Sequence, residues 1–227
     1  MNRITFYILI TFAITLSICF VNAQSKTASI NNEVVTDIDG NTYTTVTIGT
    51  QIWMVENLKT TKLNDGTAIT FSLSEQTWSD LTTPGYSLVA YEGSENLYGY
   101  FYNWYAVNTG KLAPTGWHVP NNTDFETLIN YLGGSEVAGG KLKEAGTEHW
   151  NSPNTGATNS SGFTALPGGY MSQSGTRYSF GEFGEWWSAT QTSNQNGSLM
   201  NITFGGNRAD IGSSPPKFGF NIRCLKD

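Results

Sequence analysis

The sequence predicts an α+β fold built on antiparallel β-sheet. Residues 33–58 alternate apolar and polar side chains around an Asp-Gly pair, which is typical of strands joined by a tight turn. Residues 123–132 repeat their apolar side chains at helical spacing. Short strand-like runs return later in the chain, at 163–166, 186–189, 199–204 and 218–225. Strands, then helices, then strands again indicate an α+β protein.

The segment 33–58 predicts a three-stranded meander. Asp39-Gly40 separates its first two alternating runs, and this dipeptide is a strong short-range hairpin signal. Gly49-Thr50 marks a second turn. Another Asp-Gly pair, Asp65-Gly66, predicts a further turn, and residues 71–95 have so little periodicity that we interpret them as loop.

The most regular helical pattern covers Thr123 to Leu132. Thr123 and Glu126 have the spacing of a capping box, in which each side chain satisfies a free amide at the helix start. Gly133 follows as a stop signal. The apolar side chains at i, i+3, i+4 and i+7 are Phe125, Leu128, Ile129 and Leu132. Residues 135–185 are rich in Gly, Ser and Asn, with a short helical candidate at 140–145.

The stretch YGYFYNWYAV, residues 98–107, places six aromatic side chains in ten positions. As a strand it would align Tyr98, Tyr100, Tyr102 and Trp104 on one face. As a helix it would group Phe101, Trp104 and Tyr105 with Tyr98, and Gly110 would supply the stop. We favour the helix from its length and from the helix predicted downstream.

The N-terminal residues 1–23 have the pattern of a secretory signal peptide, with Arg3, an apolar run and a cleavage site after Ala23. A lipoprotein signal ending at Cys19 fits less well, because the bulky Ile18 precedes the cysteine. Residues 24–33 are polar and predict a flexible lead-in, and 34–227 predict a single domain. No later segment is long and apolar enough for a membrane anchor. We therefore expect a secreted, periplasmic or cell-surface protein.

Charge narrows the classes of partner. The net charge of −6 becomes −7 once Arg3 is removed, and basic patches that attract nucleic acid or anionic membrane are not expected. Cys224 is the one cysteine left after residue 23, so no intramolecular disulfide is possible. Its apolar strand context predicts a buried, unreactive side chain.

Several phrases occur together in order: DIDGNTYTTVTIGTQIWMVENLKT, YGYFYNWYAV, APTGWHVPNNTDFETLINYLGG, GFTALPGGY, GEWWSAT and GFNIRCLKD. With them the chain resembles the Fibrobacter succinogenes major paralogous domain family over roughly residues 34–227. That resemblance implies a C-type-lectin-like fold, with small twisted antiparallel sheets, two flanking helices and a long irregular region that often binds ligands. It also implies that most rings of residues 98–107 belong to the core.

The family is distantly similar to the formylglycine-generating enzymes, which use a cysteine pair, so their oxidase chemistry does not carry over to a chain with Cys224 alone. A glycosidase needs two carboxylates about 5 to 9 Å apart. The nearest pair in the sequence is Glu182 and Glu185, which we interpret as a solvated turn because glycines surround it. Glu56 lies in an apolar strand and is expected to be structural. We therefore predict a protein that is not an enzyme.

We predict no metal or other cofactor. His118 and His149 each stand beside a tryptophan rather than another ligand, which favours structural roles. Lectins of this fold bind calcium through Glu-Pro-Asn and Trp-Asn-Asp motifs. The segment WNSPN at 150–154 offers no carboxylate, so calcium remains open only through unrecognised oxygen ligands.

The binding hypothesis rests on the loop-rich stretch 146–185. Aromatic rings can stack on the C–H faces of sugars while amides and charges fix hydroxyls. Trp150 has two interpretations, since it could equally anchor the loop to the core. The predicted ligand-binding residues are Trp150, Asn151, Asn154, Asn159, Tyr170, Arg177 and Tyr178.

The sequence thus predicts an exported, non-catalytic recognition module for a glycan or an extracellular protein. The alternatives are an enzyme with an unrecognised carboxylate site and a structural or adhesion component. Oligomeric state does not follow from the sequence.

Overall fold

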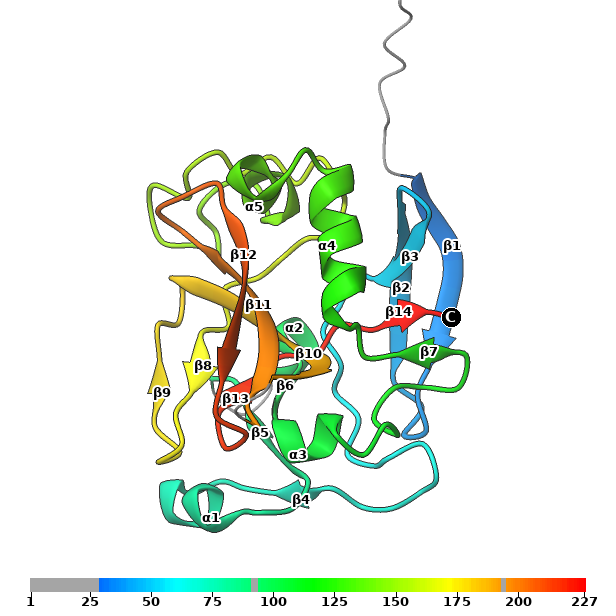
Figure 1. Cartoon of the computed structure of the whole chain (residues 1–227), viewed down its shortest axis with the longest axis vertical. Coiled ribbons are helices and arrows are strands. Elements are labelled where there is room, and N and C mark those ends of the chain that lie inside the picture. The colour runs from blue at the N-terminus through cyan, green and yellow to red at the C-terminus, as the bar shows by residue number, and fades with distance from the viewer. Residues whose placement is uncertain (1–28, 91–93, 193–194) are drawn as a thin grey trace, which may run out of the picture.

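The computed structural model describes residues 29–90, 94–192 and 195–227, with side chains from Val34 onward. These residues form a mixed α+β protein with three curled β-sheets and a few short helices (Figure 1). The sheets are antiparallel except for one short parallel pairing, of residues 70–71 with residues 85–86, which confirms the predicted α+β class. The predicted signal peptide, its cleavage site at Ala23 and Cys19 lie outside the described residues.

The first sheet contains the predicted meander. Strands β1 (Ser29–Thr36), β2 (Thr42–Ile48) and β3 (Gln51–Met54) pair in sequence, and β14 (Leu225–Lys226) and β7 (Trp117–His118) complete the order β1-β2-β3-β14-β7. Residues 29–33, expected in the flexible lead-in, instead belong to β1. Both predicted turns are present, and Gly40 and Gly49 adopt the positive φ of 85° and 67° that such turns require.

The second sheet, β10-β11-β12, consists of Phe183–Gln191, Gly197–Thr203 and Ala209–Ser214. Its first two strands confirm the predicted runs at 186–189 and 199–204. The third strand was not predicted, because ADIGSS offers little apolar alternation.

The third sheet has the order β4-β5-β6-β13-β8-β9. Its strands are Thr70–Phe71, Gly85–Leu88, Tyr100–Asn103, Gly219–Phe220, Tyr170–Met171 and Arg177–Tyr178. The strand predicted at 218–225 is wrong as one element, since β13 and β14 lie in different sheets. The strand predicted at 163–166 is also wrong, because this segment makes only an isolated bridge from Ala165 to Lys143.

The described helices are α1 (Glu75–Asp80), α2 (Glu95–Tyr98), α3 (Trp104–Val107), α4 (Asn122–Tyr131) and α5 (Ser135–Leu142). Helix α4 confirms the most regular pattern in the sequence, but its predicted cap is wrong by two residues. Asn121 accepts from the backbone of Asp124, and Asp124 caps Asn121 in return. The helix expected at 140–145 begins five residues earlier, at Ser135. None of the described helices is long and apolar enough to cross a membrane.

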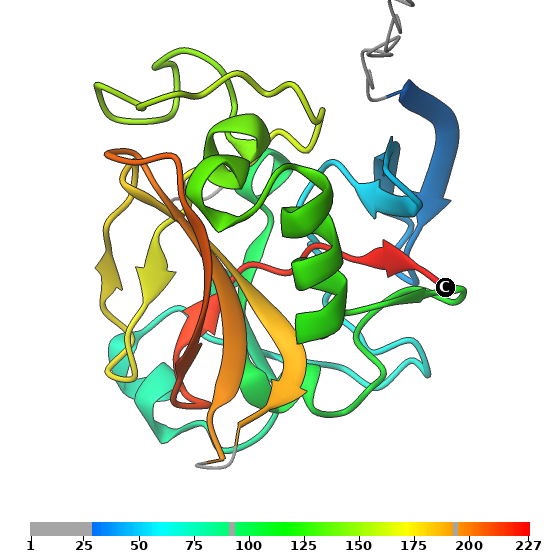
Figure 2. The same cartoon turned by 45° about the horizontal axis from the view of Figure 1, so that its top comes forward.

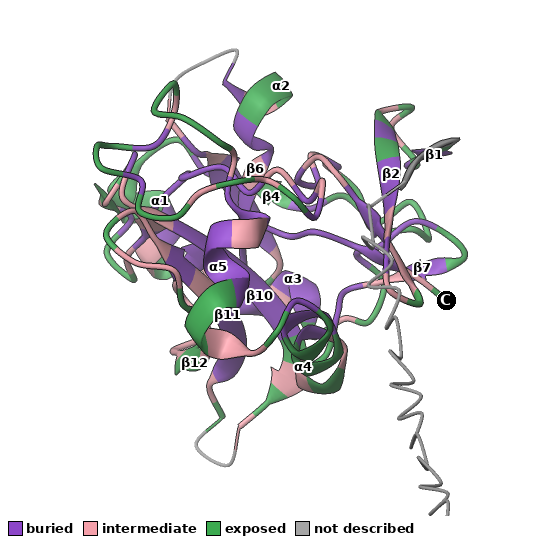
Figure 3. Cartoon of the chain, turned by 90° about the horizontal axis from the view of Figure 1, so that it is seen from above, coloured by how far each residue is buried: buried purple, intermediate pink, exposed green. Residues whose placement is uncertain are grey.

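Helix α4 lies between the first and second sheets (Figure 1) and joins their apolar faces into one core. Phe125 of α4 stacks on Trp53 of β3 with ring centroids 5.7 Å apart, and Trp186 of β10 belongs to the same cluster. Figure 3 shows exposed residues on α4 and buried residues along β10. The amphipathic face of α4 is thus what holds the two sheets together.

The aromatic stretch 98–107 changes secondary structure twice. Tyr98 ends α2, residues 100–103 form β6, and Trp104 begins α3, so the prediction of one continuous helix is wrong. Four of its six rings are nevertheless buried, which confirms the expected core role. Tyr100 and Tyr105 remain partly exposed.

The irregular segment 143–169 passes over one end of the molecule, green to yellow in Figure 2. Buried Lys143 fixes it in place, since its Nζ donates to the carbonyl oxygens of Thr155, Thr203 and Gly206 at 2.8–3.0 Å. At its other end, the guanidinium of buried Arg223 donates to the Phe163 carbonyl and lies 4.2 Å from the Phe163 ring centroid. The segment is therefore pinned to the core from both sides.

Candidate functional site

The seven predicted binding residues do not form one site. Trp150 is 1% exposed, and its Nε1 donates to the carbonyl oxygen of Ala165 at 2.8 Å. This side chain cannot stack on a ligand, so its placement in the predicted site is wrong and the alternative, an anchor for the loop, is correct.

The three predicted asparagines serve the loop itself. Asn154 is buried, and its Nδ2 donates to the carbonyl of Glu144 at 2.9 Å. Asn159 accepts from the Thr164 amide at 2.9 Å. Asn151 has an exposed side chain, while its amide donates to the Gly181 carbonyl. Asn154 and Asn159 therefore hold loop conformations, with φ of 44° and 50°.

The remaining three predicted residues do come together, on the hairpin of β8 and β9. Tyr170 and Tyr178 are register partners whose rings stack with centroids 5.6 Å apart. Arg177 binds the neighbouring part of the sheet, since its Nε donates to the Leu88 carbonyl and its Nη2 to Oγ of Ser87. The Arg177 guanidinium is thus a tether between β9 and β5.

The two tyrosines belong to a wider set of rings on one face of the third sheet, which we call the aromatic face. Register partners on neighbouring strands point to the same side, and the pairs Phe71–Tyr86, Tyr86–Tyr102 and Tyr102–Phe220 therefore continue one another. The rings of Phe71 and Tyr86 stack with their centroids 5.0 Å apart, and the ring centroid of Tyr86 lies 4.8 Å from that of Tyr100. The aromatic face consists of Phe71, Tyr86, Tyr100, Tyr102, Phe220, Tyr170 and Tyr178.

A cavity of about 520 Å³ opens at the β4 end of this face. We call it the platform cavity; it is lined by Phe71, Leu73, Leu88, Glu95 and Tyr100. Phe71 and Leu73 are 42% and 68% exposed, a high value for apolar side chains of this size. Oε2 of Glu95 is buried and has no hydrogen-bond partner among the described residues. The cavity thus combines exposed apolar surface with one free acceptor.

A second cavity, of about 260 Å³, lies where β10 and β12 meet the other half of the aromatic face. We call it the Glu185 cavity; its lining residues are Tyr170, Ser179, Phe183, Glu185, Ser214, Phe218 and Phe220. Glu185 is 8% exposed, so the expectation of a solvated turn is wrong for this residue. Burial raises its pKa from 4.5 to about 7, against a lowering hydrogen bond from Asn201. Oε2 of Glu185 has no partner in the described part of the chain.

The substitution Glu185→Gln is expected to change stability in a pH-dependent way. The folded protein holds a proton on Glu185 between pH 4.5 and about 7 that the unfolded chain releases, so stability falls as pH rises through this range. Glutamine has no charge to bury. The free energy of unfolding of the variant, relative to the parent, should therefore increase by about 1–3 kcal/mol between about pH 5 and about pH 8. Urea denaturation measures this difference, and the same value at both pH values would contradict it.

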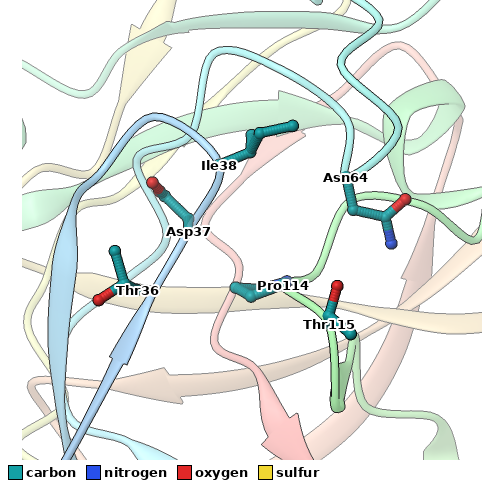
Figure 4. A pocket seen from close by; sticks show the side chains of 6 residues that line it. All are labelled: Thr36, Asp37, Ile38, Asn64, Pro114 and Thr115. Atoms are coloured by element: carbon teal, nitrogen blue, oxygen red, sulfur yellow. The ribbon is translucent and has the colours of Figure 1, made fainter.

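A third cavity, of about 230 Å³, lies between the β1–β2 turn and two loops (Figure 4). Its lining residues are Thr36, Asp37, Ile38, Asn64, Pro114 and Thr115. The carboxylate of Asp37 is occupied, since Oδ1 accepts from the amides of Asp39 and Asn41, and Oδ2 accepts from the hydroxyl of Tyr43 at 2.6 Å. The Asp37 carboxylate therefore holds the turn.

Within the described part of the chain, one group of side chains could hold a cation: the potential ligand atoms of Glu144, Glu148 and His149 lie within 4.8 Å of one another. Both carboxylate oxygens of Glu144, however, already contact Nδ1 of His149 at 2.9–3.0 Å. His118 bridges Asp124 and Asp227 at 3.3 and 2.7 Å. These contacts agree with the structural roles expected for both histidines.

The remaining sequence expectations concern Glu56 and Cys224. Glu56 accepts from the backbone amide and the hydroxyl of Thr44, a structural role. Cys224 is fully buried, which confirms the expected position in the core, and burial raises the pKa of its thiol.

Sequence reasoning missed the platform cavity because residues 71–95 were interpreted as loop. The signal available was local: Phe71 and Leu73 alternate with polar residues in TFSLS, which is typical of a strand with an apolar face. Glu185 was missed because its burial depends on rings from distant strands.

The fold and these cavities define a mixed α+β domain with an aromatic sheet face. Residues 46–226 match the family model described as the Fibrobacter succinogenes major domain, and the chain belongs to this family. No curated protein and no solved structure matches the chain.

Proposed function

We propose that this protein is an exported recognition module, of C-type-lectin-like architecture, that binds a glycan on its aromatic face. The observation that supports it most is the platform cavity, where Phe71 and Leu73 leave apolar surface exposed beside Tyr100. Exposed apolar side chains gathered at a cavity are typical of binding sites. The N-terminal signal-peptide pattern supports export.

The chemistry of the platform cavity suits a sugar. Its volume of about 520 Å³ falls within the roughly 300–1,000 Å³ of small-ligand sites. The rings of Phe71 and Tyr100 offer flat apolar surfaces, and Oε2 of Glu95 can accept a hydrogen bond from a hydroxyl. The acidic balance of the chain favours a neutral glycan over an anionic one.

The alternative of a glycan-processing enzyme depends on paired carboxylates. The lining residues of the Glu185 cavity include one carboxylate, as do those of the platform cavity. A glycosidase would therefore need a second carboxylate at either cavity, whereas a recognition role needs no group beyond the lining residues. A structural or adhesion role would need no ligand at the platform cavity.

Binding of the mature chain to a glycan panel tests the proposal. We expect at least one neutral oligosaccharide to bind, and Phe71→Ala to weaken its affinity at least about tenfold, since a stacked ring contributes on the order of 1 kcal/mol or more. Release of a shortened sugar would favour the enzyme, and a panel without any binding would favour the structural alternative.

The chain provides a matched control for this variant. Phe180 is 46% exposed and packs edge-on against Tyr98 with ring centroids 5.0 Å apart, the same centroid distance as that of the stacked pair Phe71 and Tyr86. Phe180 lines neither cavity. Phe180→Ala should therefore leave glycan affinity unchanged.

A further inference from the structure

The Glu185 cavity pairs a buried acid with aromatic rings, and none of its lining residues lines the platform cavity. The ring centroid of Tyr170 lies 6.0 Å from that of Phe218 and 6.2 Å from that of Phe220, and the two phenylalanines stack at 5.9 Å. The faces of such rings carry negative potential and attract cations. Tyr170, Phe183, Ser214 and Phe218 are partly exposed, so a ligand group can enter from solvent.

Among the described residues, no cation pairs with Glu185, although a buried carboxylate normally has such a partner. Its register partner on β11 is Asn201, a neutral hydrogen-bond donor, and the titratable group that faces it from β8 is the hydroxyl of Tyr170. From β12, Asp210 is the register partner of Asn201 and forms an ion pair with Arg208, and Ser214 lines the same cavity as Glu185. No lysine, arginine or histidine is among the lining residues. Leaving a buried carboxylate unpaired is costly, and a bound cation would remove that cost.

We propose that the Glu185 cavity binds an alkylammonium group of the kind that ends a lysine side chain. The ammonium donates to Oε2 of Glu185, and its methylene stem packs against the rings of Tyr170 and Phe218. A volume of about 260 Å³ is below the usual range for whole small-molecule ligands, which favours a narrow chain over a sugar ring. This site is separate from the platform cavity and does not depend on glycan binding.

Titration of the folded mature chain with n-butylammonium, followed by two-dimensional NMR, tests this proposal against 1-butanol as a neutral probe of similar shape. We expect saturable binding of n-butylammonium and at least tenfold weaker binding of 1-butanol. An alkyl ammonium stays charged below about pH 9. Because the cavity binds it through the carboxylate, affinity should fall about tenfold per pH unit below about pH 6 and level off above about pH 8.

Substitutions at Glu185 and Tyr170 distinguish the contribution of the carboxylate to binding from that of the aromatic rings. Glu185→Gln keeps the shape of the side chain and should weaken n-butylammonium binding at least tenfold. Tyr170→Phe keeps the ring and should bind like the parent, whereas Tyr170→Leu should bind more weakly, so the test does not depend on one variant. Nα-acetyl-lysine amide should bind like n-butylammonium, and glucosamine should bind more weakly.

Several results would overturn the assignment. They are equal affinities for n-butylammonium and 1-butanol, unchanged affinity in folded Glu185→Gln, tighter binding of glucosamine than of the lysine derivative, or no saturable binding of the ammonium probe. Loss of glycan binding in Phe71→Ala has no bearing on any of them.

Discussion

Replacing Trp104 with alanine should lower the free energy of unfolding by ~3–5 kcal/mol, the usual cost of removing a buried tryptophan. Trp104 is 2% exposed, and its Nε1 donates to the Ser188 carbonyl at 3.1 Å. Its ring also fills the space above Gly197, where an added Cβ would overlap it. The substitution therefore leaves both a cavity and an unpaired carbonyl between α3 and β10.

Chemical denaturation measures this loss, with Tyr105→Ala as the control. Tyr105 is the next residue on α3 and is partly exposed, so its removal should cost clearly less. A loss under about 1 kcal/mol for Trp104→Ala would mean that the rings of residues 98–107 do not form the core.

Trp150→Ala should be destabilising by a similar ~3–5 kcal/mol and should leave ligand binding unchanged in the fraction that stays folded. The Trp150 ring is fully enclosed, and Nζ of Lys143 lies 5.5 Å from its centroid. Its loss removes the hydrogen bond to Ala165 and loosens the segment 143–169 from the core.

Tyr178→Ala is the comparison for Trp150→Ala, because Tyr178 is 47% exposed and belongs to the aromatic face. It should cost much less stability, as exposed substitutions usually do. If Trp150→Ala unfolded at the same urea concentration as the parent yet lost its ligand, Trp150 would be a contact residue after all.

The local sequence was sufficient to predict helix α4 but not the residue at which the helix begins. Four apolar side chains at helical spacing predict one buried helix face. In the structure this face packs between the first and second sheets. Asn121 and Thr123 are both good cap residues, each with an acid three positions later. Contacts from outside the helix accompany the earlier start, since the Asn122 amide donates to Thr190 and the Pro120 carbonyl accepts from Ala189.

No single hydrophobic period, of a strand or of a helix, describes the aromatic stretch 98–107. Residues 100–103 follow the alternation of a strand and residues 104–107 the turn of a helix, with Asn103 at the junction. The side-chain oxygen Oδ1 of Asn103 accepts from the backbone amides of Ala106 and Gly85. It therefore caps helix α3 and also holds the start of strand β5. Only the second of these contacts is distant in sequence, and it could not be predicted from local pattern.

The candidate site was predictable in part. Tyr170 and Tyr178 flank a polar turn and could be expected on a hairpin surface. The burial of Glu185 depends on Tyr170, Phe218 and Phe220, which come from two other strands and a loop. Neighbouring glycines suggest a solvated turn for any isolated glutamate, so nothing local distinguished this one.

The most direct test of the aromatic face as the binding surface is the ratio of the dissociation constants of Phe71→Ala and Phe180→Ala for the glycan that binds best. The two phenylalanines match in exposure and in the distance of their ring centroid from that of a tyrosine, and they differ in whether they line the platform cavity. We predict a ratio of at least about ten, from the loss of one stacked ring in Phe71→Ala alone. A ratio near one, with both variants folded, would contradict binding at this face.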